Sequence, residues 1–266
     1  MTEPTPKATT IDTSVAHSAR VWNYWLGGKD FYPADQAAGD AYSATYPNIV
    51  PFAAESRAFL RRTLTYLTEE AGLRQFIDLG AGLPTENNTH EVAQRIAPDS
   101  RVVYVDHDPV VLLHVHALLT STDEGATDYV QTDMRDTDAV LAGAAKTLDM
   151  TRPVALVIND VLGHIEDWQE ALGLVRRLVD RLPSGSYLAL SHSTAAADAL
   201  HSQVQEAYNT SGAIPYILRE PSVSVQLFEG TELVEPGFTS WPRWRPDTNT
   251  GTLTDRAGWG GVARIR

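Results

Sequence analysis

The sequence predicts an α/β fold in which an open, doubly wound and mostly parallel sheet follows a helical N-terminal region. Three observations lead to this prediction. From residue 75 onward, short apolar runs alternate with amphipathic stretches, as in a parallel sheet with crossover helices. Before residue 75, apolar side chains recur at helical spacing instead. After residue 230 the alternation stops, and two apolar runs predict an antiparallel pair at the sheet edge.

The N-terminal region divides into a polar lead-in and a helical cap. Residues 1–10 are polar and contain proline, so we expect them to be disordered. Residues 11–70 are expected to form the cap. Its first helix has N-cap candidates at Asp12, Thr13 and Ser14 and ends at Gly27 and Gly28. A second helix is expected over residues 51–70, with its large apolar side chains on one stripe.

Residues 71–266 are expected to form the sheet domain. Five parallel strands are predicted at residues 75–79, 101–106, 128–131, 153–159 and 186–191. The predicted helices lie near residues 88–97, 108–120, 136–147, 166–182 and 194–209, and the tail adds strands at 231–239 and 259–266. Because crossovers are right-handed, the carboxyl ends of the parallel strands meet at one rim, where ligands of such sheets bind.

Composition excludes several classes of function. The 266 residues include 34 acidic and 21 basic side chains, a net charge of −13, and no cysteine. Disulfides, zinc thiolates, iron–sulfur clusters and thiol nucleophiles are therefore excluded, and the charge disfavours binding to nucleic acid or an anionic membrane. No metal site is expected, because His114 and His116 would point to different faces of a helix. Without a secretory signal or a long apolar run, we expect a cytoplasmic protein.

A glycine-rich turn follows the first predicted strand and carries the strongest functional signal. Gly80 and Gly82 allow a tight turn and the close approach of a ligand to the backbone. Thr85 stands where a dinucleotide fingerprint has its third glycine, which disfavours a nicotinamide-dependent reductase. Asp78 precedes the turn, and its carboxylate suits an ammonium group or ordered water better than a pyrophosphate. The turn therefore favours a cationic ligand.

The next three strands also end in polar side chains. Asp106 and Asp108 follow the second strand, and a carboxylate there can accept both hydroxyls of a ribose. Asp133 and Met134 follow the third strand, where they suit an adenine amino group and ring. The fourth strand ends in Asn159 and Asp160. Each of these residues has the alternative role of capping the next helix, but together they indicate a nucleoside site.

These motifs resemble the class I S-adenosylmethionine-dependent methyltransferases, and within them an actinobacterial S-adenosyl methyltransferase family. The resemblance spans about residues 12–266 and is carried by residues 19–30 (ARVWNYWLGGKD), 57–62, 75–85, 90–94, 102–111, 190–192 and 235–237. It implies the Rossmann-like, seven-stranded methyltransferase sheet, with S-adenosylmethionine in the turn at Gly80 and Gly82. It also implies Asp106 on the ribose, Asp133 near the adenine, and an N-terminal helical cap over the site.

The sequence departs from that family at a few positions. It has Trp22-Asn23 where the family usually has Tyr-Asp, and Ser56 where the family has Asn. After the fourth strand, Gly163-His164 replaces the usual His-Phe, which moves the imidazole by one position. Because that strand end usually faces the methyl acceptor, this departure bears on which acceptor is used.

The cap contributes further cofactor-binding candidates. Arg20 and Arg57 suit a clamp on the carboxylate of the cofactor, with surface salt bridges as the alternative. Gly28 belongs to a glycine turn that is expected to act as a lid over the cofactor. Tyr24 is expected in the aromatic core of the cap, with contact to the sulfonium as the alternative.

We therefore expect a methyltransferase that acts on a small-molecule acceptor, in which an oxygen, nitrogen or carbon atom is the nucleophile. The protein mainly aligns that nucleophile and removes a proton where needed. Asp160, His164 and His192 are the candidate bases, although each histidine also suits a hydrogen-bonded role in a loop. The oligomeric state stays open. The alternative function is a regulator or scaffold that binds S-adenosylmethionine without turnover.

Overall fold

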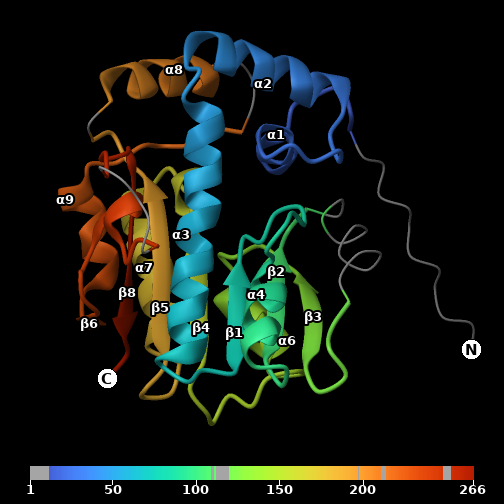
Figure 1. Cartoon of the computed structure of the whole chain (residues 1–266), viewed down its shortest axis with the longest axis vertical. Coiled ribbons are helices and arrows are strands. Elements are labelled where there is room, and N and C mark those ends of the chain that lie inside the picture. The colour runs from blue at the N-terminus through green and yellow to red at the C-terminus, as the bar shows by residue number, and fades with distance from the viewer. Residues whose placement is uncertain (1–11, 109–110, 112–119, 197, 211–213, 248–252) are drawn as a thin grey trace, which may run out of the picture.

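The computed structural model describes residues 12–108, 111, 120–196, 198–210, 214–247 and 253–266. A central sheet has helices on both faces, and a group of helices crosses the carboxyl ends of its strands (Figure 1). In the described part of the chain, seven strands follow the order β3-β2-β1-β4-β5-β8-β6, and the short strand β7 pairs with β8. The mostly parallel sheet with an antiparallel edge is confirmed.

Strands β1 to β5 pair in parallel and lie close to their predicted positions. Their bounds are β1 (Gln75–Leu79), β2 (Arg101–Asp106), β3 (Ala126–Gln131), β4 (Ala155–Asn159) and β5 (Tyr187–Ser193). The register pairs Asp106 with Gln131 and Asn159 with Ser191, so the strand ends lie level with one another. The carboxyl ends of these strands consequently meet at one rim.

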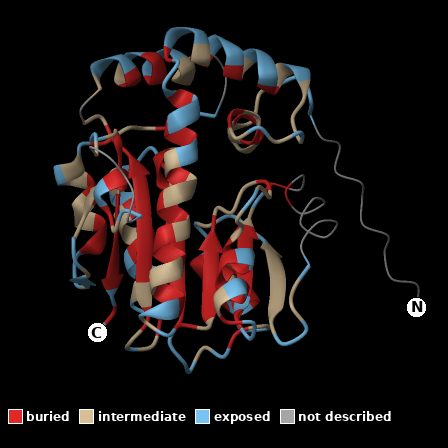
Figure 2. Ribbon diagram, in the orientation of Figure 1, coloured by how far each residue is buried: buried red, intermediate tan, exposed pale blue. Residues whose placement is uncertain are grey.

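Alternate side chains of the strands face two separate apolar cores. In β1, Phe76 packs in one core while Ile77 and Leu79 pack in the other. Helices α3 (Ile49–Glu69) and α4 (Thr89–Ile96) cover the first face, and α6 (Thr137–Ala144) and α7 (Trp168–Val179) cover the second. Burial is nearly continuous along the central strands (Figure 2). That burial on both faces explains why the strand sequences are continuous apolar runs.

The helices before the sheet differ from the predicted cap in two ways. The first helix, α1 (Ser18–Trp25), begins later than expected, because the Asp12 carboxylate accepts the N–H and hydroxyl of Ser14 in a local turn and caps no helix. A further helix, α2 (Pro33–Thr45), was not predicted. Its start is marked by the proline and by Asp35, whose carboxylate accepts the N–H of Tyr32 at 2.8 Å.

The C-terminal segments complete the edge of the sheet. They comprise α8 (Ala199–Asn209), α9 (Pro221–Ser224), η2 (Val225–Phe228), β6 (Glu232–Leu233), β7 (Thr239–Ser240), η3 (Trp241–Arg243) and β8 (Gly258–Arg264), whereas η1 (Leu162–His164) lies earlier, between β4 and α7. Strand β8 runs antiparallel to β5 and also pairs with β6 and β7. The single strand predicted at 231–239 is wrong, because a turn with Gly237 at φ +88° separates two short strands.

Two predicted helices differ from their expected ranges. The helix predicted at 194–209 begins only at Ala199, because Thr194 still bridges Arg219 beside the sheet. Most of the helix predicted at 108–120, including His114 and His116, lies outside the described residues. In the part of the chain that the structure describes, no helix has both the length and the apolar character of a membrane span.

Candidate functional site

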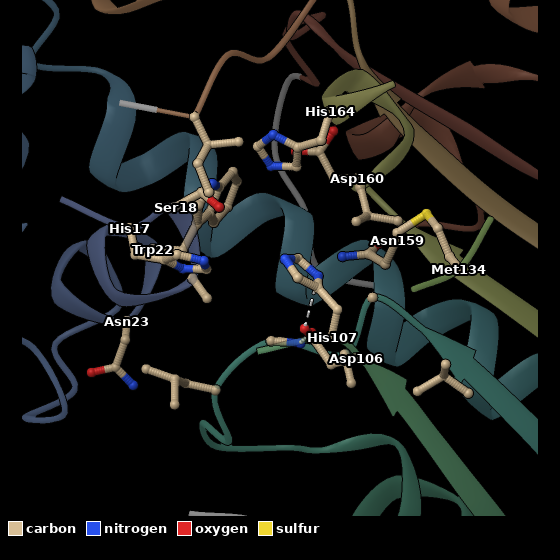
Figure 3. Close-up of a pocket in the computed structure, with 18 of the residues that line it drawn as sticks. His17, Ser18, Trp22, Asn23, Asp106, His107, Met134, Asn159, Asp160 and His164 are labelled. Carbon is tan, nitrogen blue, oxygen red and sulfur yellow. Dashed lines mark hydrogen bonds and ion pairs between the residues drawn. The ribbon is translucent and has the colours of Figure 1, made fainter. Parts of the chain in front are cut away.

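A cavity of about 380 Å³ lies at the rim where β1 to β4 end, between these strand ends and helix α1. We call it the main cavity. Its volume is in the range of small-molecule sites. Side chains from α1 and from the ends of β2, β3 and β4 converge on it (Figure 3). Of the predicted site residues, nine line it: Arg57, Gly80, Gly82, Asp106, Asp133, Met134, Asn159, Asp160 and His164.

The glycine turn and Asp106 form one structural unit. Gly80 has φ +73°, and a Cβ atom there would lie 2.5 Å from Val161, so the position has no room for a side chain. Gly82 has φ +64° and is open, with only Ala19 near a Cβ at 4.0 Å. Its N–H donates to Oδ2 of Asp106 at 2.9 Å. Each Asp106 oxygen keeps a free lone pair, so the carboxylate can still accept hydroxyl groups of a ligand.

Two polar groups beside this turn are buried without a partner among the described residues, Nε of Arg57 and Oγ1 of Thr85. The Nη2 of Arg57 donates to the carbonyls of Glu86 and Asn87, which fixes the guanidinium at the cavity wall. Unpaired buried donors are costly unless a ligand satisfies them. Together they suit a carboxylate, such as that of the methionyl part of S-adenosylmethionine.

Asp78 lies behind the turn and does not line the main cavity. Its buried carboxylate accepts the hydroxyl of Thr89 at 2.6 Å. Burial raises the pKa of Asp78 to about 6, although the Thr89 hydrogen bond and the charge of Arg57 oppose the shift. Asp78 therefore joins the end of β1 to Thr89 at the start of α4, and its carboxylate does not face the main cavity, where a ligand ammonium would lie.

The ends of β3 and β4 supply the other side of the main cavity. Asp133 is half exposed and accepts from the backbone N–H of Arg135 at 2.8 Å, while Met134 packs partly against the second core. Asn159 is held on both sides, because its amide donates to Ser56 at 3.2 Å and its carbonyl accepts from Ser191 at 2.8 Å. These residues offer an acceptor and an apolar surface to an adenine ring.

Asp160 has an unusual backbone and a fully engaged side chain. It has φ +55°, a left-handed conformation that is rare outside glycine. Its carboxylate accepts the N–H and hydroxyl of Ser193 at 2.6 and 2.8 Å and the hydroxyl of Tyr216 at 2.5 Å. Burial raises the pKa of Asp160, while these hydrogen bonds oppose that effect. Asp160 thus already accepts three hydrogen bonds, two of them on Oδ1, and these hold its carboxylate toward Ser193 and Tyr216.

The two predicted histidines are placed differently. His164 lines the main cavity, and its Nδ1 lies 2.7 Å from the carbonyl oxygen of Pro215. Because a carbonyl only accepts, the proton of the neutral ring is assigned to Nδ1, and Nε2 keeps a lone pair. Burial lowers the pKa of His164. His192 does not reach the cavity; it is buried and contacts the hydroxyl of Tyr216 at 2.8 Å, with its pKa lowered by burial to about 3.

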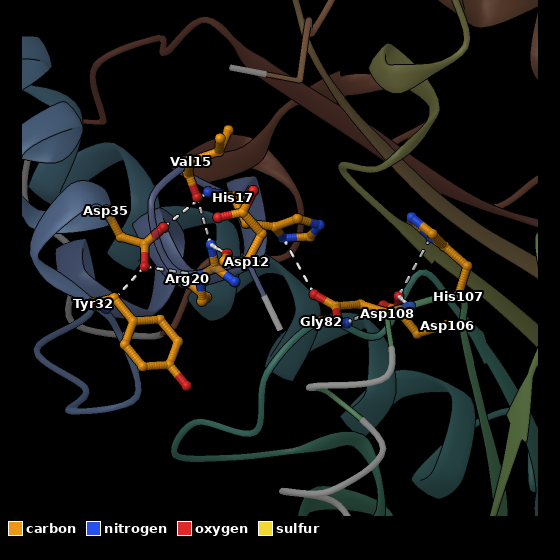
Figure 4. A network of polar contacts seen from close by, with 10 residues as sticks. All are labelled: Asp12, Val15, His17, Arg20, Tyr32, Asp35, Gly82, Asp106, His107 and Asp108. Atoms are coloured by element: carbon orange, nitrogen blue, oxygen red, sulfur yellow. Dashed lines mark hydrogen bonds and ion pairs between the residues drawn. The ribbon is translucent and has the colours of Figure 1, made fainter. Parts of the chain in front are cut away.

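The cap residues Arg20, Tyr24 and Gly28 do not line the main cavity. The Nε of Arg20 donates instead to the fully buried Asp35 at 2.8 Å (Figure 4). The Tyr24 hydroxyl donates to Asp40 at 2.5 Å, and Gly28 sits so close to Asn23 that a Cβ atom would lie 2.2 Å away. Their placement gives them structural roles within the cap.

The cap and the sheet meet through His17 and Asp108. Nδ1 of His17 lies 3.4 Å from the carboxylate of Asp108, which is itself buried beside the main cavity (Figure 4). On the far side of the same strand end, Nδ1 of His107 lies 3.6 Å from Asp106. Burial lowers the pKa of His17, so this contact is not a fixed ion pair; it marks where the start of α1 meets the end of β2. Asp108 is not among the residues that line the cavity.

Sequence reasoning missed several residues of the main cavity, namely His17, Ser18, Trp22, Ser56, Thr85, His107 and Arg135. In the sequence, Ser56, Trp22 and Thr85 stand out only as departures from known motifs. The family resemblance points to the segments that contain them, but it does not show which side chains face the ligand. His17 carries no motif, and only the path of the chain before α1 brings it to the end of β2.

The described residues fit S-adenosylmethionine. The open glycine at the turn, Gly82, leaves room for a ligand to contact the backbone. The carboxylate of Asp106 at the end of β2 suits the ribose, and the unpaired donors on Arg57 and Thr85 suit the carboxylate of the cofactor. Gly80, by contrast, is closed by Val161. Thus Gly82 has the space through which a ligand can approach the backbone.

The chain is similar over nearly its whole length to the S-adenosyl methyltransferase family, which matches residues 4–266. A DUF574 family protein from Streptomyces avermitilis MA-4680 is 45% identical, and the match covers 96% of this chain and 99% of that one with a TM-score of 0.90. A candidate methyltransferase from Thermobifida fusca YX is 35% identical, with 96% and 97% coverage and a TM-score of 0.86.

More distant structures share the fold. The plantazolicin methyltransferase BpumL is 11% identical to this chain, and the match covers 93% of this chain and 96% of that one with a TM-score of 0.51. None of the curated proteins matches the chain.

Proposed function

This chain belongs to the S-adenosyl methyltransferase family, and on that premise we propose that it methylates a small-molecule acceptor bound beside His164. It is a methyltransferase, and its cofactor is S-adenosylmethionine. One observation supports the proposal above all. The main cavity has the glycine turn with Asp106 at one side and a neutral imidazole with an available Nε2 at another. Cofactor-binding and proton-accepting groups thus share one enclosed space.

We propose the following contacts with the cofactor. Asp106 accepts the ribose hydroxyls, Arg57 and Thr85 donate to the carboxylate, and Asp133 with Met134 lies against the adenine. When bound, S-adenosylmethionine supplies a methyl group on a positively charged sulfur, which a nucleophile can displace. The remaining catalytic task for this chain is to orient the acceptor and to receive its proton.

We assign the role of base to His164, in preference to Asp160 and His192. The carbonyl of Pro215 orients the ring, so Nε2 accepts the proton. The lowered pKa of His164 keeps the ring neutral at pH 7, the state in which it can act as a base. Asp160 already accepts three hydrogen bonds from Ser193 and Tyr216, and His192 contacts Tyr216 and does not line the main cavity.

The first test measures cofactor binding by titration calorimetry. Asp106→Ala is expected to weaken S-adenosylmethionine binding about 10- to 100-fold. It removes a charged acceptor whose hydrogen bonds to the ribose are worth roughly 1.5–3 kcal/mol. The control is Asp138→Ala, whose side chain is 85% exposed on α6. Equal affinity in the two variants would show that Asp106 does not hold the ribose.

The second test separates catalysis from binding alone. The variant His164→Asn keeps an amide donor near the carbonyl of Pro215 but removes the base. We expect it to bind S-adenosylmethionine like the wild type and to form no S-adenosylhomocysteine with a cell-extract fraction that supports turnover by the wild type. Turnover by the wild type would reject the non-catalytic regulator. Full turnover by His164→Asn would remove His164 from the role of base.

A further inference from the structure

A second, smaller cavity shares a wall with the main cavity. It has a volume of about 40 Å³, and it shares Ser18, Trp22, Asp160 and His164 with the main cavity. We call this smaller cavity the annex. Its other walls are mainly aromatic and come from α1, α2, α3 and α8. The annex thus connects the proposed base with the interior of the cap.

A surface groove lies on the other side of the annex. This groove, between α2 and α8, has a volume of about 650 Å³ and shares Tyr42 and Tyr208 with the annex. Its walls are mostly apolar, and Val15 and Leu200 beside it are 49% and 45% exposed. On α2, small side chains at residues 34, 38 and 41 face the groove at helical spacing. Groove, annex and main cavity therefore adjoin in series.

The annex contains an unsatisfied polar group. His201 of α8 is only 2% exposed, it lines the annex, and its Nδ1 has no hydrogen-bond partner among the described residues. Its ring stacks on Tyr46 with centroids 5.1 Å apart, so its position is fixed by packing. Burial lowers the pKa of His201 to about 4, so the imidazole is neutral at pH 7. A buried neutral nitrogen without a partner costs stability unless a ligand or water binds it.

We propose that groove, annex and main cavity form the binding channel of the methyl acceptor, an elongated apolar molecule that ends in a hydroxyl or amine. This inference rests on the proposed function. The apolar body would lie in the groove between α2 and α8, and the polar end would pass His201 toward His164. An annex of 40 Å³ holds only a few waters, whereas a cavity that binds benzene is about 150 Å³. Only a slender end group therefore fits the annex.

The test uses 1-octanol, an elongated apolar molecule with a slender hydroxyl end, as the probe and the full chain saturated with S-adenosylhomocysteine. Calorimetry measures probe affinity in the wild type and in Ala38→Phe, which places a ring in the groove. Ala37→Phe is the matched control, because Ala37 is exposed on the same helix and does not line the groove. We expect Ala38→Phe to weaken probe binding at least tenfold, and Ala37→Phe to change it less than twofold.

His201→Phe tests the annex itself. It keeps an aromatic ring but removes the nitrogen, and we expect it to weaken binding of 1-octanol about tenfold. Replacing the probe by octane, which has no hydroxyl, should abolish the difference between His201→Phe and the wild type. The channel would be overturned if every variant binds the probe as tightly as the wild type does, or if the probe does not bind the wild type saturably.

Binding of S-adenosylmethionine is measured in the same variants and distinguishes the two proposals. The channel predicts an unchanged cofactor affinity in Ala38→Phe and His201→Phe. A protein that binds the probe in the groove but forms no S-adenosylhomocysteine would contradict the proposed function and leave the channel standing. If Ala38→Phe methylates the acceptor as efficiently as the wild type, the channel alone is contradicted.

Discussion

At the scale of single residues, Gly163 lets the ring of Tyr216 pack beside His164. A Cβ atom at residue 163 would lie 2.3 Å from the ring of Tyr216. That ring packs edge-on against His164, and its hydroxyl donates to Asp160. Glycine is therefore required at position 163, because Tyr216 occupies the space of a side chain.

Gly163→Ala is expected to destabilise the protein by about 1–3 kcal/mol, the usual cost of overpacking a filled core. The free energy of unfolding in urea measures this change. Gly173→Ala in α7 is the control, since its Cβ would meet only the flexible end of Arg177 at 3.2 Å and should add about 0.5–1 kcal/mol of stability. If the two variants have equal stability, Tyr216 does not enforce glycine at position 163.

Asp78 makes stability depend on pH. Its pKa is about 6 in the folded protein, whereas an exposed aspartate carboxyl has a pKa of 3.8, so the folded state binds the proton more tightly. The resulting stabilisation is complete below about pH 4 and is lost as the pH rises through 6. The free energy of unfolding of Asp78→Asn, taken relative to that of the wild type, is expected to rise by about 1–3 kcal/mol from pH 4 to pH 7. Unfolding in urea at both values checks this, and a difference that stays constant with pH would refute it.

At the scale of elements, α1 and α2 depend on one buried ion pair. Asp35 of α2 is fully buried and accepts from the N–H groups of His17 and Tyr32 and from Nε of Arg20. It thereby joins the start of α1, the middle of α1 and the start of α2. Because α1 forms a wall of the main cavity, this pair supports the cofactor site from outside it.

Asp35→Asn is expected to cost about 3–5 kcal/mol, because it leaves Arg20 as a buried charge without its partner. Hydrogen exchange should rise in α1 and α2 and less in the sheet, and the affinity for S-adenosylmethionine should fall. Asp138→Asn, at a side chain that is 85% exposed on α6, is the control and should behave like the wild type. If hydrogen exchange in α1 is the same in Asp35→Asn as in the wild type, the ion pair of Arg20 with Asp35 does not support α1.

At the scale of the whole molecule, the main cavity joins the cap to the sheet. Its lining comes from α1 and α3 as well as from the ends of four strands. A ligand in this cavity therefore contacts elements that are far apart in the sequence. Such a ligand stabilises the folded state as a whole, since the unfolded chain has no such site.

S-adenosylhomocysteine at 100 times its dissociation constant is expected to raise the free energy of unfolding by about 2.7 kcal/mol. Amide exchange should slow both in α1 and near Gly82. Thermal unfolding with and without the ligand, followed by exchange mass spectrometry, checks both expectations. Protection that is confined to the strand ends would mean that α1 does not cover the ligand.

The sheet and its rim could be predicted from sequence, but the cap could not be predicted in the same detail. Buried parallel strands appear as apolar runs, and the turn at Gly80 and Gly82 has a local signature. The pairing of Arg20 with Asp35 has no such signature, because it depends on how α1 and α2 pack. For the same reason the sequence placed Arg20 on the cofactor. The boundary of the cap at residue 70 stays a prediction.

Helix α3 has a consequence for how ligands are exchanged. It runs for 21 residues, about 31 Å, from α2 down the face of the sheet, and Arg62 within it donates to the carbonyls of Trp241 and Trp244. A continuous helix that is anchored to the C-terminal segment holds α3, the last part of the predicted cap, against the sheet. Opening of the enzyme between turnovers is thus expected to involve local detachment of α1 and α2, with α3 and the sheet remaining as one rigid frame.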